Sequence, residues 1–293
     1  PDAHITQDGK YLVLVGVRNQ KTKPTGILTV WKSNPAKEDR PFAIGVEAVP
    51  TCSAISSKNQ VALGCTNVVM LGDLIGNRTF LTLPTSVNHV WRAVAFTSDG
   101  SKLAAAAQDG ALVIWDCNTG KVLKNLQRNE VHFNALAFSP DDKTLAVARG
   151  RQGQRGTITL WDVDTGEVRR TLDQHTKEVH VLQFSPDGKY LASGGADQRV
   201  ILWNPQTGKA EQILRGHTGT ILALTFSPKG DRLATSGTDQ RIRIWSTRHW
   251  MQMVALHGPR ELIWSLVYSP SRPVLVAGCG DNKARIWNGG VEK

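Results

Sequence analysis

The sequence predicts an all-β fold, a seven-bladed β-propeller of four-stranded antiparallel blades. Three observations predict it: tryptophans end strand-like runs at a regular period, each period contains four short apolar runs separated by turn residues, and seven such periods fit into the 293 residues. One four-stranded sheet cannot bury both of its faces, so neighbouring copies must stack. A closed ring of sheets then leaves only short strand edges exposed.

The tryptophans set the period. Trp115 and Trp161 lie 46 residues apart because RGRQGQRG is inserted between them, and Trp31 lies 84 residues, or two periods, before Trp115. Leu71 takes the place of the missing tryptophan. The later repeats keep a spacing of 42 residues. We therefore expect one domain, 1–293, whose repeats end near Trp31, Leu71, Trp115, Trp161, Trp203, Trp245 and Trp287.

Each copy indicates four strands in a fixed order. In the fifth copy the run VHVLQF leads to the turn SPDG, then to KYLASGG, then to QRVILW, and finally to TGKAEQILRGH. Apolar alternation, enrichment in Val, Ile, Leu and Thr, and Pro, Asp and Gly at the breaks favour short strands over helices. Turn aspartates such as Asp99 and Asp187 suit hairpin turns, and we assign them no function.

The repeats around Trp203 and Trp245 follow one pattern, from Gly-His or its equivalent through FSPDG or FSPKG to the tryptophan. This pattern resembles the WD-repeat (WD40) family, and the resemblance covers essentially the whole chain. The second repeat departs from the pattern because it lacks both the tryptophan and the turn aspartate. The count of seven depends partly on including it.

The resemblance implies that a repeat starts with the outer strand of one blade, so that the two chain ends share a blade. After Trp287 only NGGVEK remains, whereas the outer strand after Trp245 runs to about Leu256. We therefore expect a three-stranded last blade with an open edge along Ala284 to Trp287. We also expect this chain to be a domain or mature fragment of a longer protein, whose upstream residues would cover that edge.

The formal net charge is +10, and much of it lies in two short segments, 18–26 and 149–156, that lack acidic residues. Both are expected between the second and third strands of their blades. The resemblance places such loops on the top face, where first strands begin and where the family usually binds partners. A positive top face would attract an acidic protein segment or a polyanion. The basic residues are Arg18, Lys21, Lys23, Arg149, Arg151 and Arg155.

Two repeats contain a histidine, a hydroxyl residue, an aspartate and a tryptophan at matching spacings. A Ser/His/Asp nucleophile would further need an exposed hydroxyl and an oxyanion site, which no motif indicates. The resemblance implies instead a buried hydrogen-bond chain that ties the blade together. We therefore predict no catalytic residue. The two sets are His217, Thr235, Asp239 and Trp245, and His175, Ser193, Asp197 and Trp203.

The four cysteines form no CxxC or Cys/His pair, so we predict neither a metal nor a cofactor. A disulfide between Cys52 and Cys65 on neighbouring strands is conceivable, but we favour free, buried cysteines. No apolar run approaches the roughly 20 residues of a membrane span. The compartment stays open, with the cytoplasm favoured.

Residues at the start of the first strands should ring the top of the central channel. Arg92 and Trp264 are the best candidates because Arg and Trp dominate interface energetics, although Trp264 could equally pack between blades. Trp91 and Phe133, one register away, are expected in the core. The full set of expected partner-binding residues is Arg92, Trp264, Glu178, His180, Asn134, His132, Gln108, Thr238, Arg149, Arg151 and Arg155.

The function that these observations favour is a non-catalytic scaffold or sensor domain that binds an acidic or extended partner segment. We expect a monomeric domain of a larger protein. Polyanion or nucleic-acid binding by the basic loops is the alternative, weakened by the lack of aromatic residues within those loops. A propeller hydrolase ranks last, because the ring supplies only Glu178 as an acidic group.

Overall fold

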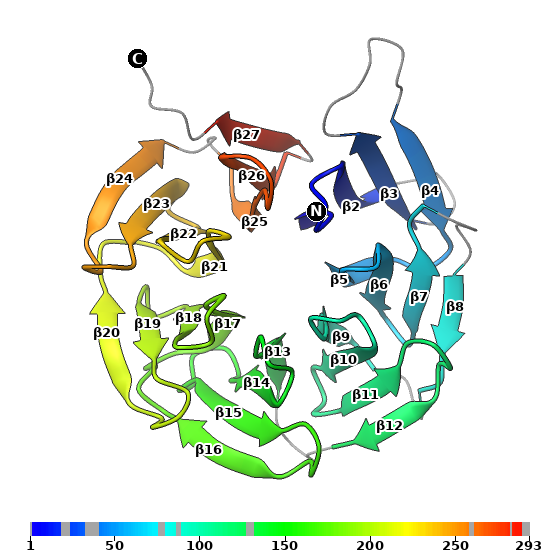
Figure 1. Cartoon of the computed structure of the whole chain (residues 1–293), viewed down its shortest axis with the longest axis horizontal. Helices are drawn as coiled ribbons and strands as arrows, with labels where there is room; N and C mark the ends of the chain where they lie inside the picture. The colour runs from blue at the N-terminus through cyan, green and yellow to red at the C-terminus, as the bar shows by residue number, and fades with distance from the viewer. Residues whose placement is uncertain are drawn as a thin grey trace.

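The computed structural model describes residues 2–18, 24–32, 41–75, 80–85, 89–126, 132–257, 261–281 and 283–288. These residues form seven antiparallel sheets, six of four strands and one of three, and no helix occurs among them. The sheets stand as blades around a common centre, with the first strand of each blade innermost (Figure 1). The predicted fold class is confirmed.

The first four blades take consecutive strands from the chain. Blade 1 contains β1 (Asp2–Ile5), β2 (Tyr11–Arg18), β3 (Thr25–Lys32) and β4 (Phe42–Val46). Blade 2 contains β5 (Pro50–Ile55), β6 (Gln60–Cys65), β7 (Val69–Asp73) and β8 (Phe80–Leu83). Blade 3 contains β9 (Trp91–Phe96), β10 (Lys102–Ala107), β11 (Leu112–Asp116) and β12 (Val122–Asn125). Blade 4 contains β13 (Phe133–Phe138), β14 (Thr144–Arg149), β15 (Thr157–Asp162) and β16 (Val168–Leu172).

The last three blades complete the ring. Blade 5 contains β17 (Val179–Phe184), β18 (Leu191–Gly195), β19 (Val200–Trp203) and β20 (Ala210–Leu214). Blade 6 contains β21 (Ile221–Phe226), β22 (Arg232–Gly237), β23 (Arg241–Ser246) and β24 (Gln252–His257). Blade 7 contains β25 (Ile263–Tyr268), β26 (Val274–Cys279) and β27 (Ala284–Asn288).

Blade 7 is the three-stranded blade that the sequence predicts. Among the described residues no fourth strand pairs with β27, so its outer edge is open. The ring closes where β1 of blade 1 lies beside β25 (Figure 1), and the Ala3 N–H donates to Ser265 Oγ across that boundary (2.8 Å). Blades 1 and 7, the first and last along the chain, are therefore neighbours in the ring.

Packing between blades explains why the second strands are almost continuously apolar. In β10 the five residues Leu103 to Ala107 are all 0% exposed, because neighbouring blades cover both faces of the sheet. Ala104 and Ala106 pack with Phe133 and Leu145 of blade 4. Ala105 and Ala107, on the other face, pack with Trp91 and with residues of blade 2. A strand covered on both faces has no solvent side to carry polar residues.

Candidate partner-binding site

The first strand is irregular near its start in blades 2 to 7. In each of these blades the register against the second strand shifts around one residue, which is left unpaired as a β-bulge. A bulge bends the strand locally and redirects the side chain of the extra residue. The bulged residues form a set at one register: Thr51, Arg92, Asn134, His180, Leu222 and Trp264.

In blades 3 to 7 a backbone hydrogen bond closes the bulge and brings a second residue beside it. The N–H that follows the second strand donates to the carbonyl that precedes the first strand, as from Gln108 to Val90 (2.9 Å) and from Thr238 to Thr220 (2.9 Å). In blade 3 the two side chains also meet, because Arg92 Nη2 donates to Gln108 Oε1 (2.7 Å). The expected site residues Gln108 and Thr238 therefore adjoin the bulged positions.

The bulged side chains differ in exposure. Arg92 and Thr51 are exposed, and Trp264 is 45% exposed, which is high for so large an apolar side chain. Asn134 is half-buried, and its Nδ2 donates to the Gly150 carbonyl (3.0 Å). Thr51 was missed at the sequence level, because the second repeat lacks the motifs that align the others.

Trp91 and Phe133, one residue before the bulge in their strands, are 0% and 1% exposed. They lie in the core, as expected. In each of these strands a buried residue is therefore followed directly by a bulged residue whose side chain points elsewhere.

The four-residue sets in blades 5 and 6 form continuous hydrogen-bond chains. In blade 6, Trp245 Nε1 donates to Thr235 Oγ1 (2.8 Å), Thr235 Oγ1 lies 2.8 Å from His217 Nε2, and His217 Nδ1 lies 2.8 Å from Asp239 Oδ2. His217 therefore hydrogen-bonds to the threonine through Nε2 and to the carboxylate through Nδ1.

Blade 5 repeats the chain with different residues. Ser193 Oγ accepts from Trp203 Nε1 (2.8 Å) and lies 2.7 Å from His175 Nε2, and His175 Nδ1 lies 2.9 Å from Asp197 Oδ2. Ser193 is 0% exposed, and His175 is 1% exposed. A hydroxyl buried in this way cannot reach a substrate.

Comparisons with known proteins agree with this geometry. A family model described as the WDR19 first beta-propeller matches residues 90–269, more than half of the chain, and one described as a WD domain, G-beta repeat, matches residues 251–288. The chain belongs to the WDR19 first-propeller family of WD-repeat propellers. Propellers of this kind are typically non-catalytic scaffolds that bind proteins.

The curated relatives share short WD-repeat segments with this chain. The small ribosomal subunit protein RACK1 of Candida albicans is 45% identical over 19% of this chain and 17% of its own length, and that of Caenorhabditis elegans is 36% identical over 31% and 27%. The WD repeat and SOCS box-containing protein 1 of Mus musculus is 32% identical over 29% and 21%. The matches span less than a third of these relatives.

Blade 3 contains a histidine–aspartate pair that the sequence analysis missed. His89 Nδ1 lies 2.6 Å from Asp109 Oδ2, although Ala105 stands where blades 5 and 6 have a hydroxyl. His89 precedes Asp109 by 20 residues rather than the 22 of the other pairs, which hid the correspondence. Trp115 Nε1 donates instead to the Pro84 carbonyl (3.1 Å).

The basic loop of blade 4, residues 150–156, lies between β14 and β15 as predicted. Glu178, only 8% exposed, accepts a hydrogen bond at Oε2 from the Gly153 N–H (3.0 Å). His180 Nε2 lies 3.9 Å from Glu178 Oε1, and burial lowers the pKa of His180 although the carboxylate opposes the shift. Glu178 is therefore a buried residue that binds the backbone of the basic loop, and its carboxylate is not exposed at the mouth of the channel.

The cations of the two basic segments have different surroundings. Arg151 and Arg155 are exposed on the basic loop, whereas Arg149 Nε donates to Thr157 Oγ1 within its own hairpin. His132 is half-buried, and its carbonyl accepts from the Gly150 N–H (3.0 Å). The Arg18 side chain, Lys21 and Lys23 lie outside the described residues.

The cysteines are free. Cys52 pairs with Gly64 and Cys65 with Pro50, so the two do not face each other across the sheet. Burial raises the pKa of Cys65 to about 11 and that of Cys117 to about 12, which keeps both as thiols at neutral pH. Across the described ranges no three His, Cys, Asp or Glu side chains gather as a metal site would require, and no helix could span a membrane.

Proposed function

We propose that this propeller is a non-catalytic interaction platform that binds an acidic or extended segment of a partner protein on its top face. The observation that carries the proposal is the set of bulged side chains at one register in six consecutive blades. Because the first strands are innermost (Figure 1), the bulged residues on them lie around one centre. A single extended segment could contact several of them at once.

Arg92 and Trp264 supply complementary chemistry within this set. Arg92 has an exposed guanidinium oriented by Gln108, which suits a carboxylate, and Trp264 offers a large exposed apolar face. Arg151 and Arg155 on the basic loop add positive charge that would steer an acidic partner toward the ring.

The test is quantitative affinity capture with the intact domain and the double variant Arg92→Glu/Trp264→Ala. The matched control is Arg248→Glu/Met251→Ala, which makes the same kinds of change at two exposed residues that precede β24. We expect the first variant to lose at least one partner that the control retains. Equal recovery of every partner by both variants would place the binding site elsewhere.

A second candidate function, polyanion binding, is favoured by the exposure of Arg151 and Arg155. Non-specific nucleic-acid binding depends on phosphate neutralisation and falls steeply with salt. Titration with a random DNA duplex at low and at physiological salt tests it. We expect no binding at either salt concentration; binding at low salt that Arg151→Ala/Arg155→Ala abolishes would favour the polyanion function instead.

A further inference from the structure

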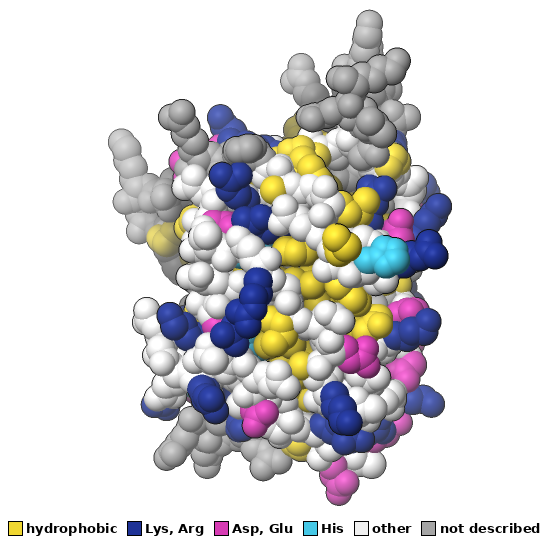
Figure 2. Space-filling model, turned by 90° about the vertical axis from the view of Figure 1, so that its left-hand side faces the viewer, with side chains coloured by type: hydrophobic (Ala, Val, Ile, Leu, Met, Phe, Trp, Pro, Cys, Tyr) yellow, Lys and Arg dark blue, Asp and Glu magenta, His cyan; other side chains and the backbone are white. Residues whose placement is uncertain are grey.

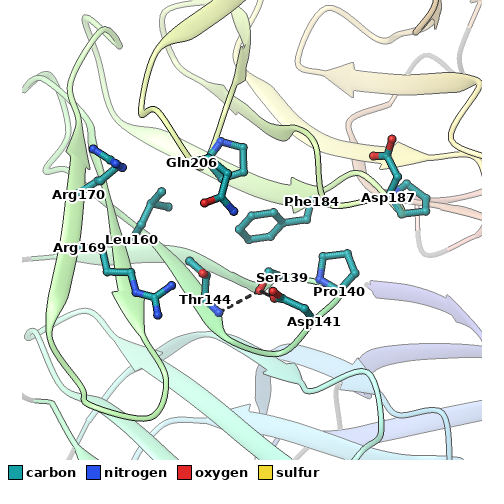
Figure 3. Close-up of a pocket in the computed structure, with 13 residues that line it drawn as sticks. Ser139, Pro140, Asp141, Thr144, Leu160, Arg169, Arg170, Phe184, Asp187 and Gln206 are labelled. Atoms are coloured by element: carbon teal, nitrogen blue, oxygen red, sulfur yellow. Dashed lines mark hydrogen bonds between the residues drawn. The ribbon is translucent and has the colours of Figure 1, made fainter.

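A groove lies between blades 4 and 5 at the end of the ring opposite the top face. It encloses about 620 Å³, a volume within the usual range of ligand pockets. The turns after β13 and β17 line it, together with the outer strand β16 and the turn between β19 and β20. Figure 3 shows Phe184 in the middle of the groove, with Arg169 and Arg170 at one end and Asp187 at the other.

Small residues keep this groove open. Thr144 lines it, and Gly208 stands in the turn beside Arg170. At the next boundary, between blades 5 and 6, the corresponding positions are Tyr190 and Trp250, whose rings pack edge to face with centroids 5.1 Å apart.

Trp250 fills that second boundary at a backbone φ of 53°, a conformation that bulky residues rarely adopt. Gly208 has a φ of 74° at the equivalent place. Hydrophobic side chains gather on that side of the ring, over β20 and β24 (Figure 2), and include Met251 at 68% exposed. Aromatic rings therefore fill this position at the boundary between blades 5 and 6, whereas Thr144 and Gly208 occupy it between blades 4 and 5.

A β-bulge brings two arginines into the groove. In β16 the register shifts so that Leu160 pairs with Arg170 and Trp161 with Val168, which leaves Arg169 as the extra residue. Consecutive strand residues normally point to opposite faces, but here both arginines line one pocket. The same bulge in blades 3, 5 and 6 carries other pairs: Leu123 and Lys124, Glu211 and Gln212, and Met253 and Val254.

One of the two positive charges is uncompensated. Arg169 contacts the Asp162 carboxylate, whereas Arg170 is exposed and has no partner among the described residues. At the far end Asp187 is paired with Lys189 (3.3 Å). One free guanidinium neutralises a single carboxylate through two parallel hydrogen bonds, whereas a doubly charged phosphate would keep one charge unbalanced.

Apolar and uncharged polar residues line the middle of the groove. Pro140 and Pro186 are exposed and Pro205 is half-buried, whereas Phe184 and Leu160, at 6% and 1% exposed, reach the groove with only a small part of their surface. Gln206 lies over Phe184 (Figure 3), and its amide can donate to and accept from a peptide backbone.

We propose that this groove, the blade 4/5 groove, binds an extended segment of a partner protein in which a Glu or Asp side chain stands next to an aliphatic or proline residue. The carboxylate pairs with Arg170, and the apolar residue packs on Pro140 and Pro186, beside the exposed part of Phe184. This site is independent of the top face, so one propeller can hold two partners or two segments of one partner.

The experiment starts from a phage-displayed library of random decapeptides selected on the wild-type domain and counter-selected on Thr144→Tyr. Tyr190 occupies the equivalent position in blade 5, so tyrosine is compatible with this turn. We expect the enriched peptides to contain an acidic residue beside an apolar one. No enrichment over Thr144→Tyr, or enrichment without the acidic residue, would overturn the proposal.

An enriched peptide is then synthesised and titrated by fluorescence polarisation. Arg170→Gln should weaken binding roughly tenfold, whereas Gln212→Glu, the same charge change at the same bulge position of blade 5, should change it less than about twofold. Trp264→Ala should leave the affinity unchanged. Equal effects of the two bulge variants, loss of binding with Trp264→Ala, or tighter binding of a peptide with phosphoserine in place of the acidic residue would each refute the assignment.

Discussion

Replacing Asp239 by alanine tests whether the hydrogen-bond chain of blade 6 is structural. The carboxylate is the final acceptor of the chain, 2.8 Å from His217 Nδ1, and it also accepts from the Thr218 N–H (3.2 Å). The side chains of His217 and Asp239 are 1% and 3% exposed. Removing the carboxylate therefore leaves a donor on His217 that water cannot reach.

The magnitude follows from that orphaned donor. An unsatisfied buried polar group costs about 1 to 3 kcal/mol, while the exposed Thr218 N–H regains water at little cost. We expect Asp239→Ala to lower the free energy of unfolding by about 2 kcal/mol. The unfolding entropy of a 293-residue chain is about 0.6 kcal/mol per kelvin, so the melting temperature should fall by about 3 °C.

Urea titration followed by tryptophan fluorescence, together with calorimetry, measures both quantities. Asp109→Ala is the internal comparison, because the Asp109 side chain is 47% exposed and water can replace it beside His89. Asp109→Ala should lower the free energy of unfolding by less than about 1 kcal/mol. Equal losses in the two variants, or a change below about 0.5 kcal/mol in Asp239→Ala, would refute a structural role for the buried chain.

Three further predictions follow from named contacts. Burial alone would raise the pKa of Asp197 and Asp239, but hydrogen bonds from the histidines and the backbone outweigh it and lower both values, so stability should be retained above about pH 4 and lost as pH falls further. The urea midpoint between pH 5 and pH 2 measures this, and Asp239→Asn should flatten the curve. Glu178→Ala should speed tryptic cleavage in the basic loop several-fold while the melting temperature changes little, because the carboxylate holds the Gly153 N–H. Gly237→Ala should destabilise the domain by more than about 2 kcal/mol, since a Cβ there would lie 2.0 Å from a backbone oxygen, whereas Gly45→Ala, with open space around it, should be neutral by the same urea titration.

The fold could be predicted because local sequence patterns that recur in each repeat indicate it. Regular tryptophan spacing, apolar alternation and turn residues each report on a few neighbouring positions, and their repetition points to stacked four-stranded sheets. The three-stranded last blade followed from counting residues after Trp287. The histidine-to-tryptophan sets were visible for the same reason, since two copies carried them at equal spacing.

Less of the candidate site was predictable. Thr51 and His89 were missed because their repeats depart from the common spacing, and the burial of Glu178 beneath the basic loop depends on contacts between blades. The bulges that redirect Arg92 and Trp264, and that bring Arg169 and Arg170 into one groove, arise from how strands pair. Pairing register is a tertiary property that no single strand encodes.

The sequence by itself predicted a ring of seven sheets, and its resemblance to WD-repeat proteins added the three-stranded last blade and the buried polar chains, because these features rest on residue spacings that recur along the chain. Only the tertiary structure decided which side chains are open to a partner. Thr144 and Gly208 leave the blade 4/5 groove open where Tyr190 and Trp250 close its neighbour, and such spaces exist only once two blades meet.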